Sequence, residues 1–194
     1  MILKIYNYNK ISSTNNQAIK LITKKNLQQG LVLSNIQTNG RGTRGKKWIS
    51  KNGNFFGSVF FGLGRNLPGF SEFSIITPVL ITKKIQQITN YENVYIKWPN
   101  DIYINNQKIC GILQEVIQNK NNKKYLIIGI GINLVSHPII KKQNISNIKN
   151  ETRVIIKNNK MMKELKKTFQ FFFKNIKSYS FKKYRNLGNS LSRK

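Results

Sequence analysis

The chain is poor in the residue types that most often carry nucleophilic catalysis and bind zinc. Its 194 residues include one cysteine, Cys110, and one histidine, His137. A disulfide framework and a cysteine-based zinc site are therefore excluded. A catalytic triad would have to pass through His137, which precedes Pro138 in a predicted loop. We expect the chemistry of this protein to rest on other groups.

Acidic residues are also scarce. The chain has six, and they are scattered along the sequence: Glu72, Glu92, Asp101, Glu115, Glu151 and Glu164. This supply argues against a cage of several carboxylates around a metal ion and against a two-metal nuclease site. Catalysis by this protein should therefore depend on cationic side chains and on hydrogen-bond donors of the backbone.

Long apolar runs are absent. No stretch of about 18 apolar residues occurs, so the sequence predicts no membrane span. The first ten residues read as a strand and not as a signal peptide. A hydrophobic content of 39% with 11% aromatic residues excludes a disordered chain. We expect one cytoplasmic domain that is large enough to bury a substantial core.

Positive charge is abundant, with 34 Lys and Arg residues and a formal net charge of +28. A basic nucleic-acid-binding module is one interpretation. However, the basic residues are spread along the whole chain, and arginine, which is best suited to bidentate contacts with phosphate and guanine, is rare. Lys, Asn and Ile have A- and T-rich codons, so a biased genome gives the same composition. We therefore predict no specific nucleic-acid partner.

Hydrophobic periodicity predicts an α/β chain of the α+β type. Hairpin-linked strands in its middle favour a mixed, largely antiparallel central sheet with flanking helices. Pro78 should kink the second helix or lie in its first turns. We expect a domain over residues 1–185 and a basic, frayed tail over 186–194. The predicted strands are 2–6, 31–36, 54–63, 94–98, 101–105, 109–118 and 125–134, and the predicted helices are 14–25, 70–90 and 160–179.

A glycine-rich stretch, "TNGRGTRGKKW" over residues 38–48, matches G-x-G-x-x-G. A dinucleotide-binding turn should open a helix and have an acidic residue about 20 positions later, and neither is found. A kinase lid would have valine where Lys47 stands. The stretch still carries Arg41, Arg44 and Lys46 among flexible residues. These features suit a mobile loop that closes over an anion.

Three further segments depart from what packing alone selects. "SSTNN", residues 12–16, places small hydrogen-bonding residues at a predicted helix start, where simple capping is the alternative. "KWPND", Lys97 to Asp101, forms a tight break between two apolar strands. "GIGIN", Gly129 to Asn133, has two glycines in a buried strand, which indicates close approach of a ligand or another backbone.

Together these segments resemble the catalytic domain of the biotin protein ligase family. The matching motifs stand in the expected order and cover the chain from about residue 5 to the last predicted helix. They are "STN" (13–15), "Q-x-x-GRG-x-RG-x-x-W" (37–48), "KWPND" (97–101), "K-x-x-GIL" (108–113) and "GIGIN" (129–133). Lipoate ligases share the fold without KWPND and are the alternative.

The resemblance implies a reaction in two steps. Biotin and ATP, with Mg²⁺ carried mainly by the phosphates of ATP, give biotinyl-5'-AMP. A lysine amine of a biotin carboxyl carrier domain then attacks this adenylate. The resemblance is also compatible with a homodimer.

Site residues follow from the same resemblance, position by position. Lys97 and Arg41 are expected to be catalytic. The residues expected to bind biotin are Ser13, Thr14, Asn15, Gln37, Gly40, Arg41, Gly42, Thr43, Lys97 and Gly111. Those expected to bind ATP or the adenylate are Arg41, Arg44, Lys46, Trp48 and Asn133.

The sequence departs from the family pattern in three places. Thr43 stands where the family often has arginine, which bears on how the loop retains the adenylate. We expect no DNA-binding domain before Met1 and no complete C-terminal barrel domain.

Overall fold

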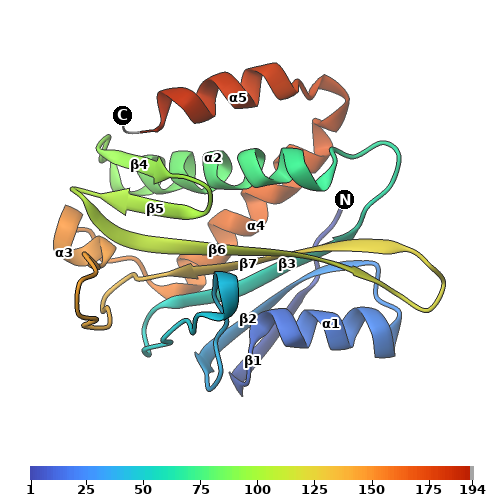
Figure 1. The fold of residues 1–194 in the computed structure, drawn as a ribbon, viewed down its shortest axis with the longest axis horizontal. Coiled ribbons are helices and arrows are strands. Elements are labelled where there is room, and N and C mark those ends of the chain that lie inside the picture. The colour runs from blue at the N-terminus through green and yellow to red at the C-terminus, as the bar shows by residue number, and fades with distance from the viewer. Residues whose placement is uncertain (193–194) are drawn as a thin grey trace.

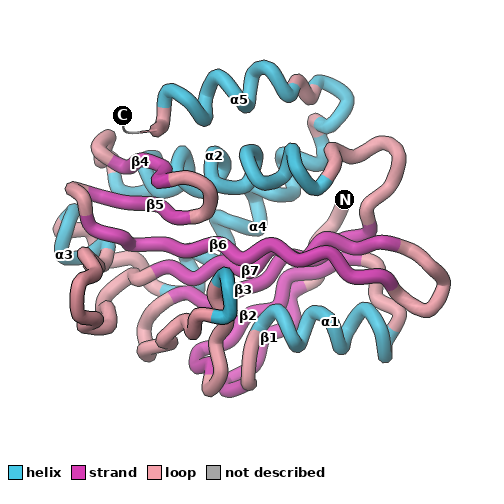
Figure 2. The backbone as a smooth tube through the Cα atoms, in the orientation of Figure 1, coloured by secondary structure: helices cyan, strands magenta, loops and turns pink. Residues whose placement is uncertain are grey.

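The structure, a computed structural model that describes residues 1–192, is a seven-stranded sheet with helices on both faces (Figures 1 and 2). The strands are β1 (Ile5–Ile11), β2 (Gln29–Gln37), β3 (Phe55–Gly62), β4 (Val94–Lys97), β5 (Asp101–Ile104), β6 (Gln107–Gln118) and β7 (Lys124–Ile132). The α-helices are α1 (Thr14–Lys25), α2 (Phe70–Thr89), α3 (Ile148–Thr152), α4 (Asn158–Lys174) and α5 (Phe181–Ser190). Two short 3-10 helices are η1 (Thr43–Gly45) and η2 (Ile176–Ser178).

The strand order is β1-β2-β3-β7-β6-β5-β4. Only the β1–β2 pair is parallel among the described strands, and every other neighbouring pair is antiparallel. Helix α1 supplies the crossover that the parallel pair requires. The predicted mixed, largely antiparallel sheet is therefore confirmed. The predicted β5–β6 hairpin is confirmed as well, with Asn105 and Asn106 at φ 49° and 66° in its two-residue turn.

Helix α1 lies on one face of the sheet, against β2, β3 and β7. It begins where the sequence predicts, because the Ser13 side chain accepts a hydrogen bond from the backbone of Asn16. It ends at Asn26 in the left-handed conformation. Its own residues Ala18 and Ile22 are fully buried. This anchoring fixes the position of the first turn of α1.

Helices α2 and α4 cover the opposite face and enclose the main core. Phe61 of β3 lies at its centre, with ring centroids 5.2 Å from Phe73 and 4.8 Å from Phe173. The predicted apolar stripe of the last long helix is buried at Met161, Leu165, Phe169 and Phe172, and Ile176 falls in η2. The stripe therefore serves packing.

The structure differs from the sequence-based elements in three places besides the C-terminal tail. The first strand begins at Ile5 and not at Ile2, which is exposed. Pro78 is buried in the interior of α2 and not in its first turns, and the predicted kink there stays a prediction. Helix α3 was not predicted, because it has five residues and no apolar period.

The prediction of a frayed tail is wrong for the described residues. Helix α5 continues the chain to Ser190 and lies along α2. Gly188 is buried beside Trp98, and the backbone N–H of Ile96 donates to Leu191 at 2.8 Å. The edge strand β4 thus gains a partner from the end of the chain.

Within residues 1–192, none of the helices combines the length and apolar character that crossing a membrane requires.

Candidate active site

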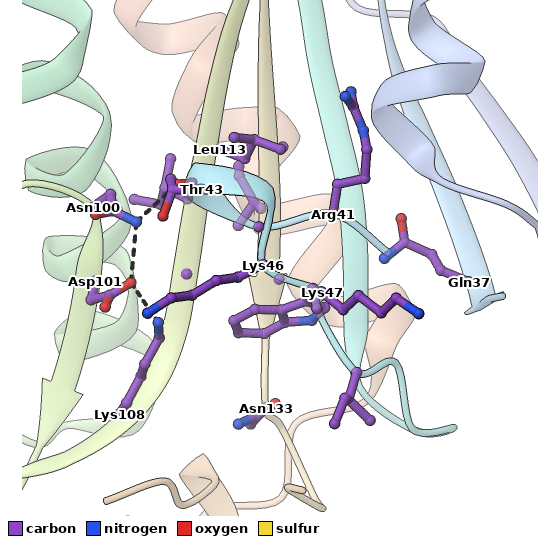
Figure 3. A pocket seen from close by; sticks show the side chains of 18 of the residues that line it. Gln37, Arg41, Thr43, Lys46, Lys47, Asn100, Asp101, Lys108, Leu113 and Asn133 are labelled. Carbon is purple, nitrogen blue, oxygen red and sulfur yellow. Dashed lines mark hydrogen bonds and ion pairs between the residues drawn. The ribbon is translucent and has the colours of Figure 1, made fainter. Parts of the chain in front are cut away.

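A cavity of about 290 Å³ opens beside the glycine-rich loop (Figure 3). Its walls come from the start of α1, the end of β2, the loop, the β4–β5 turn, β6, β7 and the segment after β7. The four segments singled out from the sequence therefore meet in one place. The predicted site residues in its lining are Ser13, Thr14, Asn15, Gln37, Arg41, Gly42, Thr43, Lys46, Trp48, Gly111 and Asn133.

Two glycines on neighbouring strands leave a patch of bare backbone in the cavity wall, here called the glycine step. Gly111 of β6 and Gly131 of β7 are partners in the sheet register. A Cβ added at either one would come within 2.6 Å or 2.4 Å of the Trp48 ring. The indole thus lies on the step, and only glycine leaves it room.

We expect Gly131→Ala to lift the Trp48 ring from this step and expose the indole to solvent. The Trp48 fluorescence should shift to the red in a Trp98→Phe background, which leaves Trp48 as the only tryptophan. Gly64→Ala is the matched control, because no atom lies within 4 Å of the added Cβ. Spectra that are identical for both variants would contradict the close approach.

A chain of neutral hydrogen bonds forms one end of the cavity. Both the backbone N–H and the hydroxyl of Thr14 donate to Gln37 Oε1, at 2.8 and 3.1 Å. Gln37 Nε2 donates to Ser50 at 3.0 Å. Ser58 Oγ, fully buried on β3, lies 2.7 Å from the Thr14 hydroxyl and 2.5 Å from Asn15 Oδ1. These groups are oriented before any ligand arrives, and they carry no charge.

The Asn15 side chain is held from several directions. Its Nδ2 donates to Glu115 Oε2 at 2.7 Å. A Cβ at Gly129 would come within 2.3 Å of its Oδ1. The second glycine position of "GIGIN" is thus explained by Trp48, and the first by Asn15.

An ion pair marks the other end of the cavity. Lys108 Nζ lies 2.7 Å from Asp101 Oδ1, and both side chains are partly buried. The antiparallel register of β5 and β6 brings them together across neighbouring strands. Figure 3 shows the side chains of Lys46 and Lys108 pointing toward Asp101. Lys108 therefore pairs with Asp101, and Lys46 extends toward the same carboxylate from the loop, on the side of the cavity away from Gln37 in this view.

The buried thiol of Cys110 lies two residues after Lys108 in the sequence but does not take part in this pair. Burial raises the pKa of Cys110 far above its ordinary value, and the charge of Asp101 raises it further. The thiolate that nucleophilic chemistry requires is therefore disfavoured.

Three predicted site residues lie outside the cavity lining. Lys97 is exposed on β4, with Nζ 5.1 Å from the Tyr103 ring centroid. Strand β4 is at the edge of the sheet, and β5 separates it from β6, which carries Lys108. Gly40 packs against the backbone of the loop itself, where a Cβ would come within 2.4 Å of Trp48 O. Arg44 lies in η1 with φ 55°. The geometry does not support the catalytic role expected of Lys97.

Arg41 lines the cavity but is oriented differently from the other cations. Figure 3 shows its guanidinium pointing away from Lys46 and Lys108. It pairs with Glu115 on β6. Arg41 therefore pairs with Glu115, whereas Lys108 pairs with Asp101.

Polar atoms in the cavity wall remain available for a ligand. Arg41 Nε, Trp48 Nε1 and Asn133 Oδ1 are buried, and the part of the chain that the structure describes offers them no hydrogen-bond partner. Buried polar groups are normally satisfied, so such atoms call for an explanation. All three belong to residues of the cavity wall, where an incoming ligand can satisfy them.

Sequence reasoning missed several residues of this site. Ser58 was detectable as a polar residue inside an apolar strand, and Lys108 was noted only as part of a motif. Glu115 had no local signal. The segment after β7 also had none, although it supplies Pro138, Ile140, Gln143 and Ile145. No group of three potential metal-ligating side chains occurs among the described residues.

Comparison with known proteins agrees with the motifs. Residues 8–133, more than half of the chain, match the Biotin/lipoate A/B protein ligase family. Among curated proteins, the bifunctional ligase/repressor BirA of Escherichia coli is 31% identical over 126 residues, and that of Bacillus subtilis is 33% identical over 129. The matched parts are 64% and 66% of this chain but 38% and 39% of those proteins. The matched stretch thus spans less than half the length of these relatives.

Solved structures extend the likeness over nearly the whole chain. Biotin protein ligase from Aquifex aeolicus, in complex with biotin and ATP, is 25% identical and superposes with a TM-score of 0.80 over 97% of this chain and 78% of that one. Biotin protein ligase from Leishmania major, at 20% identity and a TM-score of 0.84, shares the fold over 98% of this chain and 81% of its own. With the family match, the fold and the assembled motifs in agreement, the chain belongs to the biotin/lipoate A/B protein ligase family.

Proposed function

We propose that the chain is an ATP-dependent biotin protein ligase. The carboxylate of biotin attacks the α-phosphate of ATP to give biotinyl-5'-AMP and pyrophosphate. A lysine amine of an acceptor protein then attacks the mixed anhydride, forms an amide and releases AMP. The observation that carries the proposal is one cavity with oriented neutral hydrogen-bonding groups at one end and, at the other, the paired Lys108 with Lys46 in the same lining.

The neutral end of the cavity suits the ureido ring of biotin. A neutral urea needs oriented donors and acceptors and gains nothing from a charged pocket. This requirement is met by the hydroxyl, amide and backbone groups of Ser13, Thr14, Asn15 and Gln37. The Ser58 hydroxyl lies within hydrogen-bond distance of Thr14 and Asn15 and helps to orient them. These residues would bind and orient biotin.

The cationic end suits the reacting phosphate. Attack of one anion on another is favoured by preorganised positive groups where charge develops. Lys108 takes the role that the sequence suggested for Lys97, because its ammonium lines the cavity beside Asp101. Asp101 holds this ammonium in place, and Lys46 approaches from the loop. Both lysines would neutralise the converging carboxylate and phosphate.

The remaining wall suits a nucleotide base. Trp48 offers an aromatic ring and a free N–H, and Asn133 offers a free carbonyl oxygen. Pro138, Ile140 and Ile145 add apolar surface. Asp101 is the one carboxylate-bearing residue of the lining in residues 1–192, so Mg²⁺ would be carried mainly by the phosphates of ATP. The glycine-rich loop would cover the adenylate and exclude water.

The acceptor in this proposal is a lysine of a biotin carboxyl carrier domain. A net charge of +28 would attract an acidic carrier, and the association rate should fall as ionic strength rises. Association with DNA or RNA should be weak, unspecific and lost with salt. A homodimer and a cytoplasmic location stay predictions.

Pyrophosphate release provides the direct test. The chain with ATP and Mg²⁺ should release pyrophosphate when biotin is added and should not do so without it. Lipoate in place of biotin serves as the specificity control. Turnover that depends on lipoate and not on biotin would point to a lipoate ligase, and an absence of turnover with either acid would contradict the proposal.

A further inference from the structure

Glu115 is an acidic residue beside a cavity that suits anions. It lies on β6, and its side chain is 25% exposed. The chain has six acidic residues, so a carboxylate here is not explained by composition. A negative charge near a site for biotin and ATP would oppose binding unless it is neutralised. The contacts of Glu115 show what neutralises it.

One oxygen of Glu115 joins two separate parts of the site. Oε2 accepts a hydrogen bond from Asn15 Nδ2 at 2.7 Å and forms an ion pair with Arg41 Nη2. Asn15 is 100 residues away in the sequence and Arg41 is 74 away. The first belongs to the neutral end of the cavity and the second to the glycine-rich loop.

The loop is otherwise folded mainly on itself. Its hydrogen bonds include Gly42 N–H to Lys46 O at 2.7 Å and Trp48 N–H to Gly40 O at 2.9 Å. Besides the Trp48 ring on its glycine step, the pair between Arg41 and Glu115 ties the loop to the sheet. Charge-assisted hydrogen bonds are stronger than neutral ones, so this contact can fix a segment rich in glycine.

We infer that Glu115 is a positioning residue that tethers the loop over residues 40–48 to β6 through Arg41 and fixes the Asn15 amide. Because one oxygen contacts both residues, a displacement of Asn15 at the neutral end of the cavity should loosen the loop. A displacement of the loop should in turn disturb the orientation of Asn15. The consequence for turnover rests on the proposed function, whereas the tether itself is a property of the protein without ligands.

Limited trypsin digestion of the full chain without ligands tests the tether. Glu115→Ala should speed cleavage after Arg41, Arg44 and Lys46 several-fold, with Glu115→Gln intermediate because its amide oxygen still accepts hydrogen bonds. Glu92→Ala, which removes an exposed acid between α2 and β4, is the charge-matched control. Melting temperatures of all variants separate loop release from unfolding. Cleavage at the wild-type rate in a folded Glu115→Ala protein would overturn the proposal.

A double-mutant cycle tests the coupling. The Michaelis constant for biotin should rise about tenfold in Glu115→Ala, because Asn15 loses the partner that orients it, and Glu115→Gln should restore part of the loss. Arg41→Ala in the Glu115→Ala background should add less than it does in the wild type. Additive effects would overturn the coupling. If the wild-type chain itself shows no biotin-dependent turnover, the proposed function fails while the digestion still decides the tether.

Discussion

Replacing Lys108 with alanine should lower the rate of adenylate formation by about 10²–10³-fold, the loss typical of one preorganised charge contact at a reacting centre. The reason is the position of its ammonium, which lines the cavity 2.7 Å from Asp101. Pyrophosphate release with biotin and ATP measures the effect. Because the contact is made mainly in the transition state, the loss should appear in kcat more than in the Michaelis constant for biotin.

Lys97→Ala is the matched control for this experiment. Both residues are lysines on neighbouring parts of the sheet, but Lys97 is exposed on the edge strand, over the Tyr103 ring. Its removal should leave the rate within about threefold of the wild type, because one exposed charge contributes little through solvent. A large loss in Lys97→Ala together with a normal rate in Lys108→Ala would reverse our assignment.

Replacing Phe61 with alanine should lower the free energy of unfolding by about 3–5 kcal/mol. Phe61 is fully buried where β3 meets α2 and α4, between the rings of Phe73 and Phe173. Removing its ring leaves a cavity that the two neighbouring helices could fill only by shifting toward the sheet, which the surrounding packing resists. Urea denaturation measures the change.

Phe171→Ala is the control for the stability experiment. Phe171 lies on α4, like Phe173, but it is 70% exposed. Its loss should change the free energy of unfolding by less than about 0.5 kcal/mol, as expected for a surface substitution. Equal losses at both positions would mean that the core does not lie where β3 meets α2 and α4.

Elements with strong local signals could be predicted from the sequence. Helix α1 begins after Ser13, and the asparagine pair of the β5–β6 turn adopts positive φ, as the pattern indicates. Helix α5 was missed because it packs against α2, which is far away in the sequence, and local sequence does not describe that contact. Pro78 lies inside α2 and not in its first turns, and the predicted kink stays a prediction.

The residues of the candidate site also fall into those that the sequence could predict and those that it could not. The motifs identified the loop, the start of α1 and the glycines of β7, because each departs locally from what packing selects. The choice between Lys97 and Lys108 depends on which strand lies at the sheet edge. No spacing within "KWPND" carries that information.

By itself, the sequence determined the fold class, the family resemblance and the segments that form the site, because periodicity, turn residues and motifs are local properties. The tertiary structure alone decided which side chains meet. It placed Gly111 opposite Gly131 beneath Trp48, Lys108 beside Asp101, and Glu115 between Asn15 and Arg41. Strand order and cross-strand register set these contacts, and both result from the packing of the whole chain.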